Sequence, residues 1–134
     1  LTQITAASPS LEQYIHRDIP RKSLVSSSVF DGVDVIGCEG GSFSPAEIFR
    51  KAEFKALLDE LSQNYDVIFM EGPELNAYAD TKEMLDYADR VLPVFSATAG
   101  INAADQASIE FLKAQGEKLM GAVLNKVEVQ DLKL

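Results

Sequence analysis

Three short apolar runs that alternate with helix-type segments constrain the fold of this chain more than any other feature. The run DVIFM, residues 66–70, has hardly any polar alternation, which is typical of a strand covered on both faces in a parallel sheet. RVLPVFS at residues 90–96 indicates a strand with an edge or irregular position at its proline, and LMGAVLN at residues 119–125 indicates a last buried strand. Strands that alternate with helices through short loops predict an α/β sandwich with a mainly parallel sheet.

The strongest helix signal covers residues 45–61. Ser44 is placed to cap the N-terminus of this helix, Pro45 to occupy its first position, and Glu47 to complete a capping box. Apolar residues then recur at helical spacing and predict a buried stripe formed by Ile48, Phe54, Leu57, Leu58 and Leu61.

Weaker signals complete the pattern. Residues 8–15 predict one or two helical turns, because Ser, Pro and Glu open a short amphipathic run. Residues 23–29 and 33–37 are β-prone runs separated by the turn-forming pair Asp31-Gly32, and at least the second run predicts a strand. Two further helices are predicted at residues 81–89 and 102–116, the second ended by glycine.

The composition predicts one soluble domain over residues 1–134, because a chain that is 46% hydrophobic can bury a core at this length. Its formal net charge of -9 repels nucleic acid and anionic lipid headgroups, so neither is expected as a partner. No apolar run approaches the roughly 20 residues of a membrane span. The single cysteine, Cys38, fits a reducing, cytoplasmic compartment, and with the single histidine, His16, it makes no usual zinc ligand set.

Polar residues follow the predicted strands, at the sheet edge where α/β proteins bind ligands. These strand ends are Gly37, Glu71-Gly72-Pro73, Ser96-Ala97-Thr98 and Asn125-Lys126. Glu71 stands where a Walker B aspartate would hold a magnesium ion beside the phosphates of a nucleotide. The alternative interpretation is that Glu71 caps a neighbouring helix or faces solvent.

The 134 residues contain no phosphate-binding loop of the form G-x-x-x-x-G-K-[ST], in which backbone amides and a lysine receive the phosphates. The glycine-dense stretch GCEGGSFS, residues 37–44, has an acid and no lysine, and it is interpreted as a connection before a capped helix. The sequence also shows no catalytic triad and no activated Cys-His pair. Cys38 is therefore interpreted as a core or loop residue and His16 as a surface residue.

Three segments in order resemble the bacterial tyrosine-kinase family, whose P-loop domains are attached to chain-length regulators of exopolysaccharide, capsule and lipopolysaccharide synthesis. They are SPAEIF at residues 44–49, YDVIFMEGPE at residues 65–74 and GAVLN at residues 121–125, within a match from Gly40 to about Glu128. The resemblance implies a three-layer, P-loop-NTPase-like sandwich, incomplete or degenerate, of which this chain is the carboxyl portion. The family acts as ATP-dependent tyrosine kinases.

The resemblance implies roles only for residues at matching positions. Glu71 takes the place of the Walker B aspartate and is the candidate metal ligand. Asp80 matches an aspartate that follows this motif. Asn125 and Pro73 match positions that contact the nucleotide in related ATPases.

Departures from the family predict a domain without catalytic residues. Glu replaces Asp at residue 71, Gly72 and Glu74 replace a Thr and a Pro, and the Walker motif is therefore degenerate. A carboxylate at Glu74 would repel a bound triphosphate by a few kcal/mol at an effective dielectric constant of about 20. We expect a regulatory or interaction domain of polysaccharide biosynthesis and export, without a cofactor, with other subunits of that machinery or a second copy of itself as partners.

Two alternatives stay open. In the first, the chain is a fragment of an active tyrosine autokinase whose phosphate loop lies upstream, and it binds ATP and magnesium on the cytoplasmic side of an inner-membrane protein. In the second, it is a receiver-like signalling domain. YDVIFME then resembles the strand that carries the phosphoacceptor of that family. Ala97 to Ala99 resemble the family's Thr-Ala step, and Lys126 resembles its lysine.

Overall fold

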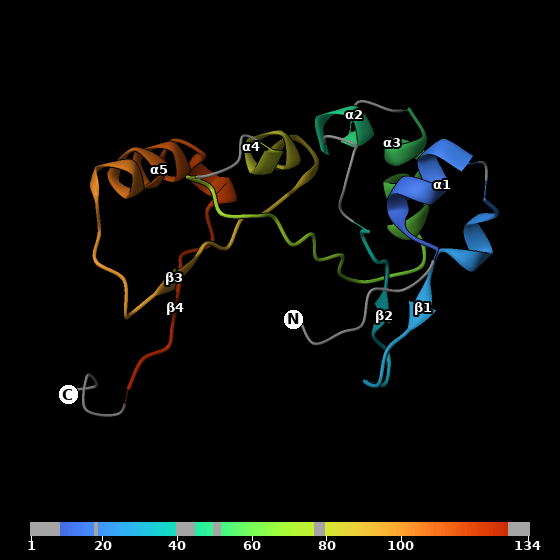
Figure 1. Ribbon diagram of the computed structural model, residues 1–134, viewed down its shortest axis with the longest axis horizontal. Coiled ribbons are helices and arrows are strands. Elements are labelled where there is room, and N and C mark those ends of the chain that lie inside the picture. The colour runs from blue at the N-terminus through green and yellow to red at the C-terminus, as the bar shows by residue number, and fades with distance from the viewer. Residues whose placement is uncertain (1–8, 18, 40–44, 50–51, 77–79, 129–134) are drawn as a thin grey trace. The chain divides into compact units, whose positions relative to one another are not determined.

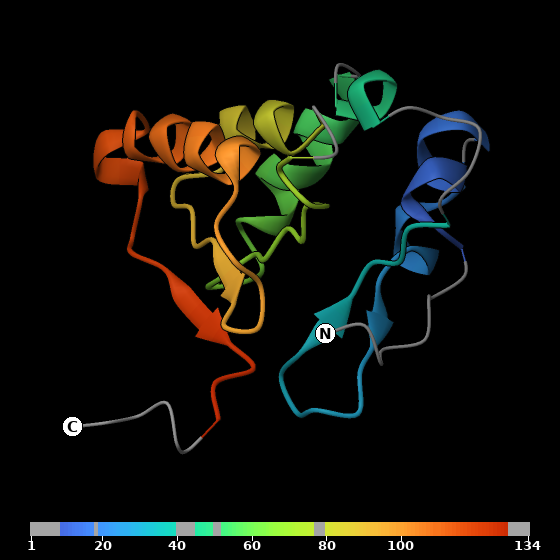
Figure 2. The same ribbon diagram turned by 60° about the vertical axis from the view of Figure 1, so that its left-hand side comes forward.

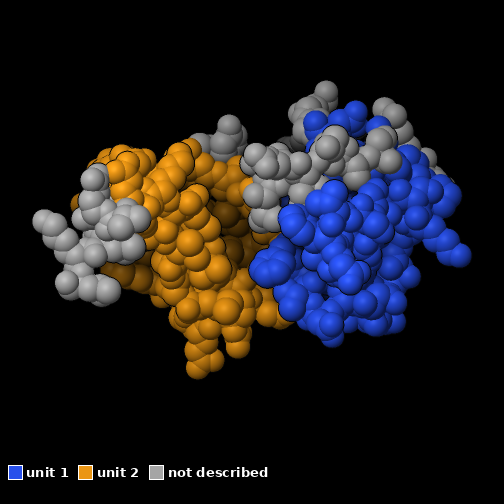
Figure 3. Space-filling model, turned by 90° about the horizontal axis from the view of Figure 1, so that it is seen from below, with its two compact units in different colours: residues 1–69 blue, residues 70–134 orange. Residues whose placement is uncertain are grey.

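The computed structural model describes residues 9–17, 19–39, 45–49, 52–76 and 80–128. The chain divides into two compact units, residues 1–69 and residues 70–134, which Figure 3 shows in different colours. Each unit is described by itself below. The expectation that residues 1–134 form a single domain stays a prediction.

The first unit contains helices and a short antiparallel hairpin. Its elements are α1 (Leu11–Arg17), the 3-10 turn η1 (Arg21–Ser23), β1 (Ser26–Ser27), β2 (Asp34–Val35), α2 (Pro45–Phe49) and α3 (Ala52–Leu61), as labelled in Figure 1. In the hairpin, Ser26 lies opposite Val35 and Ser27 opposite Asp34. Gly32 has a φ of 71° at the turn, a backbone conformation that glycine adopts without strain. The predicted pair of β-prone runs with a turn between them is confirmed.

A reciprocal pair of hydrogen bonds fixes the beginning of α1. The backbone N–H of Gln13 donates to the hydroxyl of Ser10 at 3.3 Å, and the backbone N–H of Ser10 donates to the side chain of Gln13 at 3.4 Å. This is a capping box, in which two amides at the helix start find acceptors. Because Ser10 is buried, the bonds also satisfy its polar atoms. The predicted helical turns within residues 8–15 are confirmed.

Helices α2 and α3 supply most of the apolar core of the first unit. Phe49 and Phe54 pack with ring centroids 5.0 Å apart, in a tilted arrangement that aromatic pairs prefer. Of the predicted stripe, Leu58 is only half-buried, and the buried members are Ile48, Phe54, Leu57 and Leu61. The cap predicted at Ser44 lies outside the described residues.

The predicted strand at residues 66–70 is wrong. These residues form no strand, and Val67 and Phe69 expose 64% and 87% of their surface. A strand is held by hydrogen bonds to neighbouring strands. In the described parts of the chain, the two sheets are the β1–β2 and β3–β4 pairs, and neither extends to this run.

The second unit has the strand–helix–strand order of an α/β protein. Its elements are α4 (Asp80–Met84), the 3-10 turn η2 (Leu85–Tyr87), β3 (Val94–Ser96), α5 (Ala103–Lys113), the 3-10 turn η3 (Gly116–Lys118) and β4 (Val123–Asn125). Strands β3 and β4 are parallel, with Val94 opposite Val123 and Ser96 opposite Asn125. Figures 1 and 2 show the two strands side by side, with α5 in the connection between them. The predicted α/β class and the parallel pairing are confirmed.

Helix α5 is fixed at both ends. The side chain of Asn102 accepts hydrogen bonds from the N–H groups of Ala104 and Asp105, and the carboxylate of Asp105 accepts one from the backbone N–H of Asn102. After the helix, Gly116 adopts a φ of 59° and begins η3. The ammonium group of Lys118 donates to the carbonyl oxygen of Leu85 at 2.9 Å, which ties η2 to the end of η3.

The last predicted strand is present, but it is not buried. Val123 and Leu124 of β4 are exposed, as are Val94 of β3 and Leu92 and Met120 beside the two strands. Parallel sheets normally have both faces covered. Among the residues that the structure describes, only two strands form this sheet, so its faces and outer edges lack the cover that the sequence pattern predicts.

None of the helices among the described residues is long and apolar enough to cross a membrane.

The side chain of Tyr65 ties the end of α3 to the hairpin. Its hydroxyl donates to the carboxylate of Asp34 at 2.6 Å, and Arg21 forms an ion pair with Glu60 of α3. The hydrogen bond to Asp34 raises the pKa of Tyr65 above its ordinary value, burial and the charge of Asp34 raise it further, and Arg21 opposes the change. The neutral hydroxyl is therefore the form that stabilises the fold.

We expect Leu57→Ala to lower the free energy of unfolding by about 2–4 kcal/mol, because the leucine is 2% exposed and its removal leaves a cavity in the core. Urea denaturation followed by circular dichroism measures the change. Val29→Ala is the control, since Val29 is 92% exposed and its loss should change stability by less than about 0.5 kcal/mol. Equal effects of the two variants would contradict the described core.

We expect Tyr65→Phe to lower the free energy of unfolding at pH 7 by at most about 1 kcal/mol, because solvent weakens this exposed hydrogen bond. The contribution should be fully present below the unfolded tyrosine pKa of about 10. It should disappear as the pH rises through the raised pKa of folded Tyr65, where the donor is lost. Urea denaturation over a pH series measures this, with Tyr14→Phe as the control; a difference that grows with alkaline pH would reverse the predicted sign.

Candidate functional site

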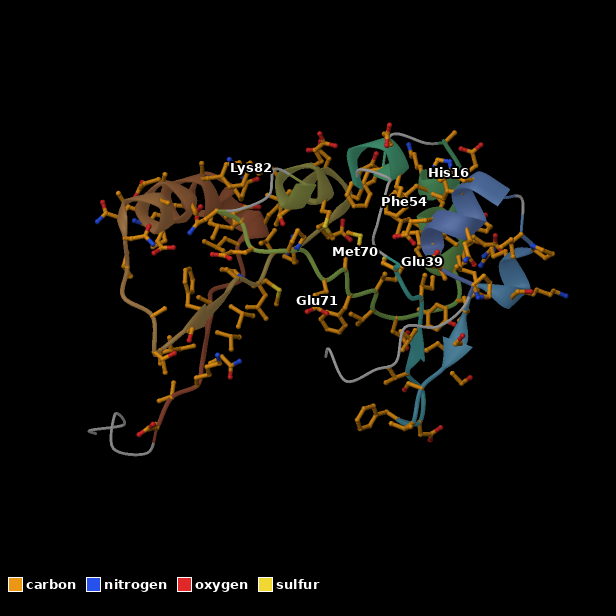
Figure 4. The ribbon with its side chains drawn as sticks, viewed as in Figure 1. His16, Glu39, Phe54, Met70, Glu71 and Lys82 are labelled. Atoms are coloured by element: carbon orange, nitrogen blue, oxygen red, sulfur yellow. The ribbon has the colours of Figure 1, made fainter. Side chains whose placement is uncertain are left out.

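An exposed acidic loop, residues 71–74, is the candidate site. Glu71, Gly72, Pro73 and Glu74 are all exposed, and no strand leads into the loop. Figure 4 labels Glu71 and the preceding Met70. Among the residues that the structure describes, the carboxylate of Glu71 makes no hydrogen bond or ion pair.

The loop lies tightly against α4. The hydroxyl of Thr81 donates to the carbonyl oxygen of Pro73 at 2.8 Å. A Cβ atom at Gly72 would lie 3.1 Å from the Thr81 hydroxyl oxygen and 3.4 Å from the sulfur of Met84. Glycine is therefore the residue that allows this close approach of the loop backbone to the helix.

A second attachment joins the end of the loop to α5. The side-chain amide of Asn76 donates to Asp105 at 2.5 Å, and its oxygen accepts a hydrogen bond from the hydroxyl of Ser108. Helices α4 and α5 also contact each other directly, because the ammonium group of Lys82 lies 5.1 Å from the ring centre of Phe111. Figure 4 labels Lys82 on α4.

The carboxyl ends of β3 and β4 lie together, as the sequence predicted for those two strands. Ser96 pairs with Asn125 across the sheet, and the hydroxyls of Ser96 and Thr98 are 2.9 Å apart. The side-chain oxygen of Asn125 accepts from the backbone N–H of Lys126 at 2.8 Å. Lys126 itself adopts a φ of 59°, which is uncommon for a residue with a Cβ atom.

The structure brings together only part of the predicted site. Pro73 and Glu71 share one loop, and Asp80 begins the helix that holds this loop through Thr81. No hydrogen bond or ion pair between the described side chains of Glu71 and Asn125 is present. The roles that the family resemblance implies for these residues stay predictions.

The acidic loop offers few protein ligands for a metal ion. Among the described residues, no group of three or more His, Cys, Asp or Glu side chains could hold one. Magnesium, however, is often bound through one or two carboxylates together with substrate phosphates and water. The carboxylate of Glu71 can act as a magnesium ligand of this kind only beside a phosphate. Most of the glycine-dense stretch at residues 37–44 lies outside the described residues.

Cys38 does not resemble an activated nucleophile. The cysteine forms no disulfide and its residue is exposed. Its sulfur is nevertheless partly buried, which raises the pKa of the thiol, and the charge of Glu12 raises this pKa further. A raised pKa leaves less of the reactive thiolate at neutral pH. The interpretation of Cys38 as a loop residue is in accord with this environment, and His16 is exposed as expected.

Three residues of the site were not found by sequence reasoning, namely Asn76, Thr81 and Asp105. The Asn102-x-x-Asp105 spacing is a recognisable capping signal. Asn76 and Thr81 carry no such signal, because their partners are distant in the sequence.

Two comparisons with known proteins give a match. No known protein-family model matches the chain. CapB of Staphylococcus aureus, assigned as a tyrosine-protein kinase, is 26% identical over 86 residues, which are 64% of this chain and 38% of CapB. The crystal structure of the VpsO kinase domain matches with a TM-score of 0.79 at 21% identity, over 95% of this chain and 63% of that one. The chain thus spans well under half of CapB, and the likeness to VpsO shows the fold alone.

We expect Gly72→Ala to lower the free energy of unfolding by about 1 kcal/mol, because the added Cβ atom presses on Thr81 and Met84. Gly100→Ala is the matched control, since nothing lies within 4 Å of the Cβ position at Gly100. The control should be neutral or slightly stabilising. Urea denaturation measures both variants; equal stability of the two would show that the loop does not lie against α4.

Proposed function

We propose, on the premise that this chain is a relative of the bacterial tyrosine kinases, that it is a regulatory or interaction domain without catalytic residues. It would act in exopolysaccharide, capsule or lipopolysaccharide biosynthesis and export, as a cytoplasmic domain with other subunits of that machinery as partners. We further propose that its α/β fold is a degenerate three-layer, P-loop-NTPase-like sandwich forming one domain. The parallel β3–α5–β4 unit and the likeness to the VpsO kinase domain support this fold.

The observation that carries the proposal is the charge of the candidate site. Glu71 and Glu74 expose two carboxylates on one short loop, and the 134 residues contain no glycine- and lysine-containing phosphate loop to offset them. A second carboxylate beside a triphosphate costs a few kcal/mol at an effective dielectric constant of about 20. Binding of a nucleotide to this chain is therefore disfavoured.

The exposed apolar residues around the parallel strands support an interaction role. Five large side chains are exposed there: Leu92, Val94, Met120, Val123 and Leu124. Exposed apolar residues that cluster on one feature are typical of surfaces that other polypeptides cover. In the proposed interaction domain, this apolar surface would bind a partner protein.

The second candidate function is a portion of an active ATP-dependent tyrosine kinase, which the kinase assignments of CapB and VpsO favour. In that case Glu71 would take magnesium, Pro73 and Asn125 would contact the nucleotide, and Asp80 would act beside them. The lysine and amides that receive the phosphates would come from a part of the protein outside these 134 residues. The phosphate loop is therefore the feature that separates the two functions.

We expect isothermal titration of this chain with Mg-ATP to give no saturable heat, because two carboxylates line the site. A micromolar dissociation constant would refute the proposed function. Glu74→Gln is an informative variant, since saturable binding that appears only after removal of this charge would confirm that Glu74 prevents nucleotide binding. Autophosphorylation of the full-length parent protein, assayed in parallel, would instead support the kinase alternative.

A further inference from the structure

Among the described residues, the side chain that attaches the acidic loop to α5 is Asn76, two residues after the loop. Both polar atoms of the Asn76 amide are used, because its nitrogen donates to Asp105 at 2.5 Å and its oxygen accepts from Ser108. Asp105 and Ser108 are three residues apart on α5, and residues at this spacing share one face of a helix. Asn76 therefore contacts two successive turns of α5.

The carboxylate of Asp105 serves the helix and the loop at the same time. One of its oxygens accepts from the backbone N–H of Asn102 at 2.7 Å, as part of the capping box. The other accepts from the Asn76 amide. The first turn of α5 and the end of the loop thus share one hydrogen-bonding group.

The middle of the loop is attached to α4, where the hydroxyl of Thr81 donates to the carbonyl oxygen of Pro73 at 2.8 Å and Gly72 lies against Met84. Only Glu74 and Leu75 lie between Pro73 and Asn76. This short segment can move little while Pro73 is held by α4 and Asn76 by α5. The position of Glu74, which lies between the two attachments, is therefore tied to that of the two helices.

We propose that Asn76 is a positioning residue that fastens the acidic loop to the first turns of α5. Displacement of these turns displaces the carboxylate of Glu74 with them. This inference rests on the proposed function in taking residues 71–74 as the functional loop. It concerns the geometry of the loop alone and holds in the absence of nucleotide.

Spin labels measure the loop position directly. In a Cys38→Ala background, labels at Glu74→Cys and Gln106→Cys report the distance from the loop to the exposed face of α5 by double electron–electron resonance. We expect one narrow distance distribution in this protein and a broad distribution after Asn76→Ala. An unchanged distribution in the Asn76→Ala variant would overturn the proposal.

Ser108→Ala provides a second test that keeps the helix cap intact, because Ser108 contacts Asn76 and takes no part in the capping box. We expect the distance distribution between the same two labels to broaden in this variant too, because one of the two hydrogen bonds of the Asn76 side chain is lost. Asn64→Ala is the control, since the side-chain amide of Asn64 donates to the carbonyl oxygen of Glu60, near the end of α3. Equal distributions in the unmodified protein and the two variants would contradict the proposal and would leave the proposed function, tested by nucleotide titration, untouched.

Discussion

The parallel pairing of β3 and β4 is the interaction on which the second unit depends. Parallel neighbours cannot be joined by a tight turn, so the chain must cross over, and α5 is that crossover. The place of α5 then determines where the loop can attach, because Asn76 bonds to its first turns. The pairing of the strands thus determines the position of α5, and the position of α5 determines that of the loop at Glu74.

The sequence predicted elements well where the controlling interactions are local. Capping residues and helical spacing depend on neighbours within four positions, and the short helix after Ser10, the stripe around Leu57 and α5 were accordingly found. The strand at residues 66–70 was predicted from apolar content alone. Whether an apolar run becomes a strand depends on distant partners, which the local pattern does not contain, and the same applies to the burial of β4.

The candidate site was predicted in its charge but not in its attachments. Glu71 and Glu74 follow an apolar run and precede a helix, and this order is visible in the sequence. Asn76 could not be singled out, because an asparagine in a loop is ordinary and its partners lie about thirty residues away, as the contacts with Asp105 and Ser108 show. The likeness to CapB, at 26% identity over 86 residues, leaves the chemistry of the loop to be tested.

The exposed run Val67, Ile68 and Phe69 has a consequence for the behaviour of the protein at high concentration. A short apolar segment without cover can stack with copies of itself in cross-β aggregates. Asp66 and Glu71 flank this run, and acidic residues in such flanking positions act as gatekeepers, because stacking would bring like charges into register. The carboxylates of Asp66 and Glu71 thus counteract self-association of the exposed apolar run.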